Sequence, residues 1–229
     1  MPEVSVGADL HADVTAVVGY PSARVEASGL IIGRNAHVRS GSTIYLGSRI
    51  GHGFQTGHNV VIREECAIGD DVSVWSNTVV DYGCRIGNRV KIHSNCYIAQ
   101  YTDIEDDAFI APGVTIANDL YPGQEASARL MSGPSTGRGA QIGVNVTILP
   151  FVRIGARCLI GAGAVVVFDI PEGSVAFGNP AVVRGRVDDL ISIEKRVEAV
   201  SNSANRYRRK CQERARVVSL GGRRDDRDR

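Results

Sequence analysis

Two residues with side chains suited to proton transfer and hydrogen bonding, His93 and Asn118, stand 25 positions apart. Histidine titrates near neutral pH, so the imidazole of His93 is a candidate general base. The side-chain amide of Asn118 can donate and accept hydrogen bonds beside a reacting group. Two further polar residues, Tyr82 and Gln100, precede Asn118 at intervals of 18 residues. This recurrence predicts that the polar side chains stack in a column on a repeating backbone.

A repeat of six residues runs from Ile32 to Asn118 and places an aliphatic side chain at the same point of each hexad. Fourteen of these fifteen positions hold Ile or Val, and only Thr56 interrupts the series. Glycine recurs with a second period of 18 residues, at Gly33, Gly51, Gly69 and Gly87. Three hexads therefore make one coil, as is typical of a hexapeptide β-helix. The sequence thus predicts an all-β fold, a parallel β-helix shaped as a triangular prism.

The prism predicts where each part of the chain lies. Its aliphatic residues point inward, and its corners are turns in which Gly, Asn and Asp adopt unusual dihedral angles. Residues 1–30 follow the six-residue period only weakly. They predict an irregular first coil that covers the open end of the β-helix. The hexads stop at Asn118 and return in another frame at Ile142. We therefore expect a loop, residues 119–139, to leave the coil, and long loops on rigid scaffolds are more often functional than idle.

Two segments are expected along the chain: a β-helix domain over residues 1–186, and residues 187–229 with a C-terminal helix and a charged tail. From Asp188 the apolar residues follow helical spacing, and Asp188 itself is a candidate N-cap. Residues 205–229 hold ten Lys or Arg and four acidic residues, although the whole chain has a net charge of +1. Because acidic residues interrupt the arginines and no aromatic platform accompanies them, we interpret the tail as solvated and expect no nucleic-acid binding.

Several classes of protein are disfavoured by composition. The apolar runs are too short for a membrane helix. The first thirty residues lack the basic start and apolar block of a secretory signal. Of the five cysteines, Cys66, Cys84 and Cys96 fall at the small inward position of a hexad and are expected to be reduced core residues. We therefore expect a cytoplasmic protein with no membrane partner.

Particular segments resemble a known family. The hexads, the expelled loop, and the segments 160–166 (IGAGAVV) and 178–181 (GNPA) resemble the left-handed β-helix acyltransferases. The segments 104–112 (IEDDAFIAP), 117–122 (ANDLYP) and 139–150 (GAQIGVNVTILP) resemble the subgroup that N-acetylates amino sugars on nucleoside diphosphates. The left-handed coil is implied by this resemblance alone, because parallel crossovers are otherwise almost always right-handed.

The resemblance implies an acetyl-CoA-dependent N-acetyltransferase that acts on a nucleotide-linked amino-deoxy sugar. It also implies a homotrimer with its active sites between subunits. In the family, the residue that matches Asn118 contacts the substrate near the reacting amine. The neighbouring Asp119 and Tyr121, together with Tyr82 and Gln100 of the column, are then candidate substrate-binding residues.

Coenzyme A is the donor that the resemblance implies. In the family its pantetheine arm runs along the coil between neighbouring subunits, and Gly143, Ala162 and Gly163 match positions on that path. Arg184 is a candidate for binding the phosphates, because a guanidinium pairs well with them. We expect no metal.

Three alternatives remain open. A sugar O-acetyltransferase of the same fold would need a base such as His93, because a hydroxyl is a poor nucleophile. A γ-type carbonic anhydrase would use three histidines around a metal, and although His58 and His93 are 35 residues apart, Ile98 stands where the third ligand should be. A non-catalytic β-helix protein would need neither the expelled loop nor a polar pocket.

Overall fold

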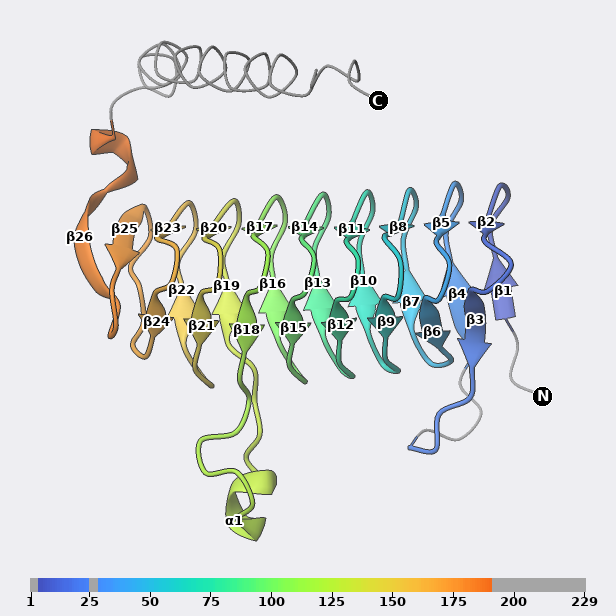
Figure 1. The fold of residues 1–229 in the computed structure, drawn as a ribbon, viewed down its shortest axis with the longest axis horizontal. Coiled ribbons are helices and arrows are strands. Elements are labelled where there is room, and N and C mark those ends of the chain that lie inside the picture. Colours follow the sequence, from blue (N-terminus) through green and yellow to red (C-terminus); the bar gives the residue numbers. More distant parts are fainter. Residues whose placement is uncertain (1–3, 25–28, 191–229) are drawn as a thin grey trace, which may run out of the picture. The chain divides into compact units, whose positions relative to one another are not determined.

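The computed structural model describes residues 4–24 and 29–190, so most of the predicted C-terminal helix and the charged tail lie outside the described residues. One compact unit spans Met1–Val187. This unit is a left-handed parallel β-helix in which short strands form three sheets, one along each face of a prism (Figure 1). The predicted fold class is confirmed.

The strands follow one another around the three sheets. Sheet A contains β1 (Val4–Val6), β4 (Leu30–Ile32), β7 (Arg49–Ile50), β10 (Ala67–Ile68), β13 (Arg85–Ile86), β16 (Asp103–Ile104), β19 (Ser135–Thr136) and β22 (Arg153–Ile154). Sheet B contains β2 (His11–Ala12), β5 (His37–Val38), β8 (Gln55–Thr56), β11 (Ser73–Val74), β14 (Lys91–Ile92), β17 (Phe109–Ile110), β20 (Gln141–Ile142), β23 (Leu159–Ile160), β25 (Ser174–Phe177) and β26 (Val182–Arg186). Sheet C contains β3 (Val17–Tyr20), β6 (Thr43–Tyr45), β9 (Val61–Ile62), β12 (Val79–Val80), β15 (Tyr97–Ile98), β18 (Thr115–Ile116), β21 (Thr147–Ile148) and β24 (Val165–Val166).

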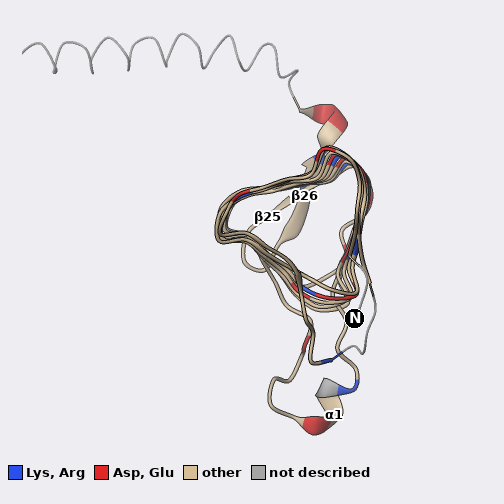
Figure 2. Ribbon diagram, turned by 90° about the vertical axis from the view of Figure 1, so that its right-hand side faces the viewer, with Lys and Arg blue, Asp and Glu red and all other residues tan. Residues whose placement is uncertain are grey.

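Residues 18 apart are neighbours on adjacent coils, as the second period predicts. In sheet A, Ile68 pairs in register with Ile50 on one side and Ile86 on the other. Every aliphatic hexad residue from Ile32 to Ile116 is at most 5% exposed. Viewed along the coil, the stacked turns superimpose in a triangular outline (Figure 2). We call its corners AB, BC and CA, after the sheets that meet there.

The corners contain the left-handed dihedral angles that the sequence predicts, but the glycines with the 18-residue period do not provide them. Positive φ angles occur two places later instead, as at Asn35 (58°) and Asp71 (56°). A Cβ atom at Gly33 would lie 2.6 Å from the backbone of Gly51 on the next coil. These glycines are therefore required by the close approach of successive coils.

The predicted first coil is present, with β1, β2 and β3 adding one strand to each sheet. The chain then leaves the coil at corner CA, between β3 and β4. The expelled loop leaves at the same corner, between β18 and β19 (Figure 2). It carries the short helix α1 (Glu125–Ala128).

The loop is shorter than the predicted 119–139. The strand β19 (Ser135–Thr136) already pairs with β16 and β22, so the coil has resumed by residue 135. The backbone N–H of Ser132 donates to the carbonyl of Asn118 and closes the base of the loop. Thr136 occupies the inward position and is fully buried. Because it is neither Ile nor Val, the hexad pattern did not reveal this coil.

The coil ends in an antiparallel hairpin. β25 extends sheet B in parallel with β23, and β26 then pairs antiparallel with β25. A 3₁₀ helix, Val187–Asp189, follows β26.

Candidate functional site

His93 lies at corner BC, directly after β14, in a row of aromatic rings. Its ring is stacked on Trp75 of the preceding coil, with centroids 5.6 Å apart and planes at 19°. On the other side the ring of Phe109 is 5.0 Å away. In the part of the chain that the structure describes, no hydrogen bond engages the imidazole nitrogens, so both are free for a reactant.

Beyond His93 the residues in line at the same corner are small. The strand registers place Ala111, Gly143 and Gly161 in line after His93 on successive coils. The result is a strip of small residues that begins at the imidazole, in which Ala111 is buried and Gly143 and Gly161 are half-buried. The N–H groups of these three residues donate to carbonyls of the next coil, but those of Val144 and Ala162 have no partner among the described residues. This corner can therefore still donate to an extended chain with amide groups.

The predicted donor residues gather near this strip. Gly143, Ala162 and Gly163 all belong to corner BC. Gly163 has a φ of 70° and open space where a Cβ atom would lie. Arg184 is on β26, at the end of sheet B, and its guanidinium lies 5.8 Å from the ring centre of Phe177.

Asn118 lies at corner CA, at the root of the loop, and the predicted polar column is present there. Its side-chain Nδ2 donates to Oε1 of Gln100 on the preceding coil. It also lies 3.3 Å from the sulfur of Met131. Among the described residues nothing bonds to Oδ1 of Asn118. Gln100 therefore orients this amide and leaves its oxygen as a free acceptor.

Tyr82, lower in the same column, is already covered. The guanidinium of Arg24 lies 3.6 Å from its ring centre, and Tyr101 contacts it edge-on at 5.4 Å. Arg24 is held 3.3 Å from Glu64, which is fully buried and also bonded by Arg63 at 2.9 and 3.0 Å. Burial is the largest single influence on Glu64 and raises its pKa. The hydrogen bonds and charge of Arg63, together with the backbone N–H of Glu64 itself and the hydroxyl of Ser22, outweigh burial and keep that pKa below its usual value.

Asp119 organises the loop itself. Its Oδ1 accepts from the backbone N–H of Tyr121 at 3.0 Å and from the hydroxyl of Ser127. Beside it the loop encloses a hollow of about 200 Å³, which we call the loop hollow. Its lining comprises Asn118, Leu120, Tyr121, Gln124, Ala126, Ser127, Leu130 and Phe151. The predicted residues Asn118 and Tyr121 thus line one mostly apolar space.

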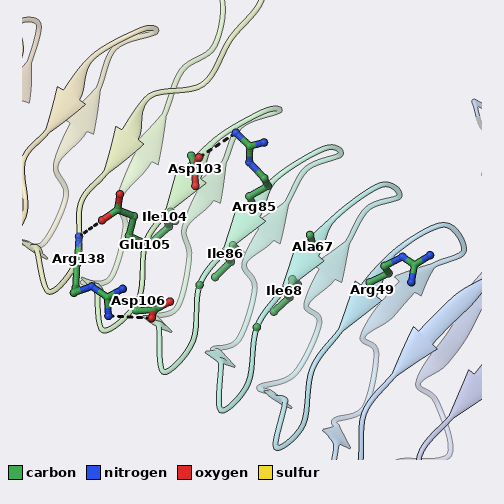
Figure 3. Close-up of a pocket in the computed structure, with 12 residues that line it drawn as sticks. Arg49, Ala67, Ile68, Arg85, Ile86, Asp103, Ile104, Glu105, Asp106 and Arg138 are labelled. Carbon is green, nitrogen blue, oxygen red and sulfur yellow. Dashed lines mark hydrogen bonds and ion pairs between the residues drawn. The ribbon is translucent and has the colours of Figure 1, made fainter.

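A larger hollow, about 580 Å³, lies on sheet A and contains none of the predicted site residues (Figure 3). Four of its charged side chains form ion pairs with each other. Arg85 contacts Asp103 at 3.1 Å, and Arg138 contacts Asp106 at 3.0 Å. The backbone N–H of Arg138 donates to Glu105 at 2.8 Å. The candidate functional site is therefore placed at corners BC and CA and not on sheet A.

A single chain keeps the two halves of the predicted site apart. His93 and the donor residues belong to corner BC, whereas Asn118, Asp119, Tyr121, Gln100 and Tyr82 belong to corner CA. The width of sheet C separates these corners. His93 and Asn118 do follow strands of the neighbouring sheets B and C, but within one chain His93 is not among the residues that line the loop hollow beside Asn118.

Two residues of this region were missed from the sequence. Trp75 is the chain's only tryptophan and stands 18 residues before His93, so the stacking rule that produced the polar column predicts their contact. No comparable signal points to Arg24, because the hexads are irregular between Tyr20 and Leu30.

A cluster of metal-ligating side chains and a membrane-spanning helix are both absent from residues 4–24 and 29–190. This part of the chain contains no group of three or more His, Cys, Asp or Glu side chains that could hold a metal ion. It also contains no helix with the length and apolar character needed to cross a bilayer.

Comparison with protein families identifies the repeat. A family model described as bacterial transferase hexapeptide (six repeats) matches residues 47–81, 83–118 and 133–167. A second model, the hexapeptide repeat of succinyl-transferase, matches residues 151–184. The chain belongs to the hexapeptide-repeat acyltransferase family. The two models together span more than half of this acyltransferase-family chain.

Two curated relatives align with parts of this hexapeptide-repeat protein. A galactoside O-acetyltransferase from Lactococcus lactis is 48% identical over 48 residues, which are 21% of this chain and 23% of the relative. A dTDP-3-amino-3,6-dideoxy-alpha-D-galactopyranose 3-N-acetyltransferase from Aneurinibacillus thermoaerophilus is 40% identical over 73 residues, 31% of this chain and 38% of the relative. The matched stretches thus cover well under half of either relative.

Among solved structures, UDP-N-acetylglucosamine acyltransferase from Campylobacter jejuni aligns with a TM-score of 0.52 at 17% identity. The alignment covers 84% of this chain and 82% of that chain. It shows that the two share the hexapeptide-repeat fold.

Proposed function

We propose that this hexapeptide-repeat protein transfers an acetyl group from acetyl-CoA to the amine of a nucleotide-linked amino-deoxy sugar. The division of its polar and glycine-rich features between two corners carries the proposal. Corner BC combines an imidazole with a strip of small residues, which leaves room beside it for a thioester on a pantetheine arm. Corner CA combines a free amide oxygen with a loop, which suits an acceptor amine.

We infer that three copies of the chain join these halves. The outward residues of the strands in sheet C carry no charge between β6 and β24. They are Thr43, Val61, Val79, Tyr97, Thr115, Thr147 and Val165. By contrast, Arg49, Arg85, Asp103 and Arg153 project from sheet A. An uncharged face is the one most easily buried against other copies.

The geometry of a three-fold arrangement explains why sheet C is the face to bury. If the three copies turn sheet C toward a common axis, corner BC of each copy meets corner CA of the next. His93 of one copy then approaches the loop and Asn118 of its neighbour. Burying sheet A or sheet B in this way would bring other corners together and leave His93 apart from Asn118.

The reaction assigns a task to each half. The amine nitrogen attacks the thioester carbonyl carbon, a C–N bond forms, and the C–S bond breaks to release the thiol. The nitrogen loses one proton in the process, and His93 accepts this proton and passes it to the departing sulfur, so that CoA leaves as the thiol. Oδ1 of Asn118 accepts a hydrogen bond from the amine and aligns its lone pair with the carbonyl carbon. Backbone N–H groups at corner BC stabilise the developing oxyanion.

The test is a screen of nucleotide-linked amino sugars with acetyl-CoA, in which released thiol is measured. We expect thiol release that depends on both substrates, with N-acetylated product detected by mass spectrometry. Calorimetry with CoA alone provides a second measurement. A protein that neither binds CoA nor releases thiol with any acceptor would be a non-catalytic member of the fold.

Sugar O-acetylation is the second candidate, and the similarity to a galactoside O-acetyltransferase favours it. The two reactions differ in how much they need a base. A neutral amine is already a fair nucleophile, whereas a hydroxyl must lose its proton as it attacks. The same thiol assay with hydroxyl acceptors that lack an amine distinguishes them.

A further inference from the structure

The loop hollow has a lining that does not match the polar parts of the proposed substrates. Leu120, Tyr121, Leu130 and Phe151 surround it, and these side chains remain between 48% and 70% exposed. The hydroxyl of Ser127, one of its few polar groups, is already engaged by Asp119. A diphosphate placed there would meet no cation in the lining, and a sugar hydroxyl or a pantetheine amide would find little besides the side-chain amides of Asn118 and Gln124 to replace its hydrogen bonds to water.

The size of the hollow exceeds what an acetyl methyl group needs. Its volume is about 200 Å³. An apolar cavity of about 150 Å³ lined by similar side chains is large enough to bind benzene. A methyl group would therefore leave most of the space unfilled, and unfilled apolar space forfeits packing contacts.

The loop hollow lies beside the place where the acyl group would be transferred. Asn118 lies in its wall and, under the proposed function, holds the amine that receives the acyl group. The carbon chain attached to the reacting carbonyl is then the apolar part of either substrate that lies nearest. Phe151 also belongs to corner CA, one coil beyond Asn118, so the hollow opens at the level where the donor strip of a neighbouring copy would lie.

We propose that the loop hollow is an acyl-chain pocket and that the enzyme uses straight-chain acyl-CoA donors longer than acetyl-CoA, with Leu130 and Phe151 limiting their length. This inference rests on the proposed function and extends its donor class from acetyl to short aliphatic acyl groups. Each additional methylene buried in the hollow removes further apolar surface from water and so favours binding of the longer chain.

The test compares kcat/KM for acetyl-CoA, butyryl-CoA and hexanoyl-CoA with one acceptor. We expect the value for butyryl-CoA to lie within tenfold of that for acetyl-CoA or above it. A butyryl-CoA value more than tenfold lower would overturn the proposal. It would indicate that the hollow receives an apolar edge of the acceptor or stays empty.

Variants locate the effect in the hollow. Leu130→Trp fills the space from an exposed position, so we expect the ratio of butyryl to acetyl kcat/KM to fall at least tenfold. Val14→Trp, at a fully exposed site in the first coil, is the matched control and leaves this ratio unchanged. Phe151→Ala enlarges the hollow and raises the hexanoyl to butyryl ratio. Ratios that do not respond to either hollow variant contradict the assignment.

The experiments distinguish a failure of the proposed function from a failure of the acyl-chain pocket. If no acyl-CoA yields thiol with any acceptor, the proposed function fails. The acyl pocket is then tested by calorimetry. We expect the wild-type protein to bind butyryl-CoA more tightly than acetyl-CoA, and the Leu130→Trp variant to show no such preference. If acetyl-CoA reacts and butyryl-CoA is rejected, only the pocket assignment fails.

Discussion

The imidazole of His93 is held by rings on both sides and by no hydrogen bond within the described part of the chain. Stacking on Trp75 at 5.6 Å and contact with Phe109 at 5.0 Å restrict the rotation of the ring. A catalytic triad histidine differs, because a carboxylate there fixes its tautomer. With both nitrogens free, His93 is suited to a reaction in which the base assists only moderately.

Replacing His93 with alanine measures this assistance. Because a neutral amine attacks without prior deprotonation, we expect kcat with an amino-sugar acceptor to fall by roughly 10²-fold or less, the low end of the range for general bases. With a hydroxyl acceptor the same change should abolish turnover. Steady-state kinetics with both acceptors provides the measurement, and equal losses for the two would contradict this account of the base.

Gly163 allows a test of the donor strip without strain. Its φ of 70° resembles that of Asn145, which occupies the same corner position one coil earlier with a φ of 56°. Asparagine tolerates this conformation, so Gly163→Asn should fold normally while its side chain narrows the strip. We expect KM for acetyl-CoA to rise about tenfold, the low end of what one misplaced group costs in a substrate site.

Gly139 supplies the matched control for this variant. It has a φ of 65°, and a Cβ atom there would meet only the side chain of Arg157, at 4.0 Å, but it lies at corner AB. Gly139→Asn should leave KM for acetyl-CoA unchanged. An equal rise in both variants would mean that the effect comes from the coil and not from a donor strip.

At the scale of the element, side chains connect successive turns at corner AB. The backbone N–H of His52 donates to Asp70 at 2.7 Å, that of Asp70 donates to Asn88 at 2.9 Å, and that of Asn88 donates to Asp106 at 2.8 Å. Each bond satisfies a backbone donor that the strands, only two residues long, leave unpaired. The ladder thus fixes the rise from one coil to the next.

Asp106 makes part of this ladder dependent on pH. The backbone N–H of Asn88, with further help from Arg138 and Arg89, lowers the pKa of Asp106 below its usual value. Since that pKa is lower in the folded than in the unfolded chain, its stabilisation is complete above the unfolded value of about 3.9 and is lost as the pH falls toward the folded value. Asp106→Asn keeps the acceptor but removes the charge.

Thermal melts should therefore show a lower Tm for Asp106→Asn than for wild type at pH 7, with the difference closing below about pH 4. High salt should narrow the difference at pH 7, because exposed charges are screened. A Tm difference that stays constant from pH 7 to pH 3 would mean that the carboxylate charge contributes nothing to the ladder.

The hexad pattern predicted the coil because each two-residue strand points one aliphatic side chain into the core, so this residue recurs every six positions. The prediction weakened where that residue changes type. Thr56 was placed correctly, since regular hexads flank it on both sides. Thr136 was not, because the loop precedes it and removes the frame. A buried threonine at the first hexad after an insertion carries no periodic signal of its own.

For the whole molecule, the same stacking rule explains what could and could not be foreseen about the site. Adding 18 to a residue number gives its vertical neighbour, so the column of Gln100 and Asn118 was predicted correctly and their hydrogen bond was found. The rule does not give distances across a face. It therefore could not show that sheet C separates His93 from Asn118. The proposed three-fold assembly would bring the two residues together across neighbouring copies.

Mixed assemblies of two impaired variants test this last inference. One variant carries His93→Ala and Gly163→Asn at corner BC, and the other carries Asn118→Ala and Tyr121→Ala at corner CA. In randomly mixed trimers, roughly a quarter of the contacts between neighbours join an intact corner BC to an intact corner CA. We expect co-expressed, doubly tagged protein to exceed the average kcat/KM of its two parents. Activity equal to that average would mean that each site is completed within one chain, and the assembly about sheet C would have to be abandoned.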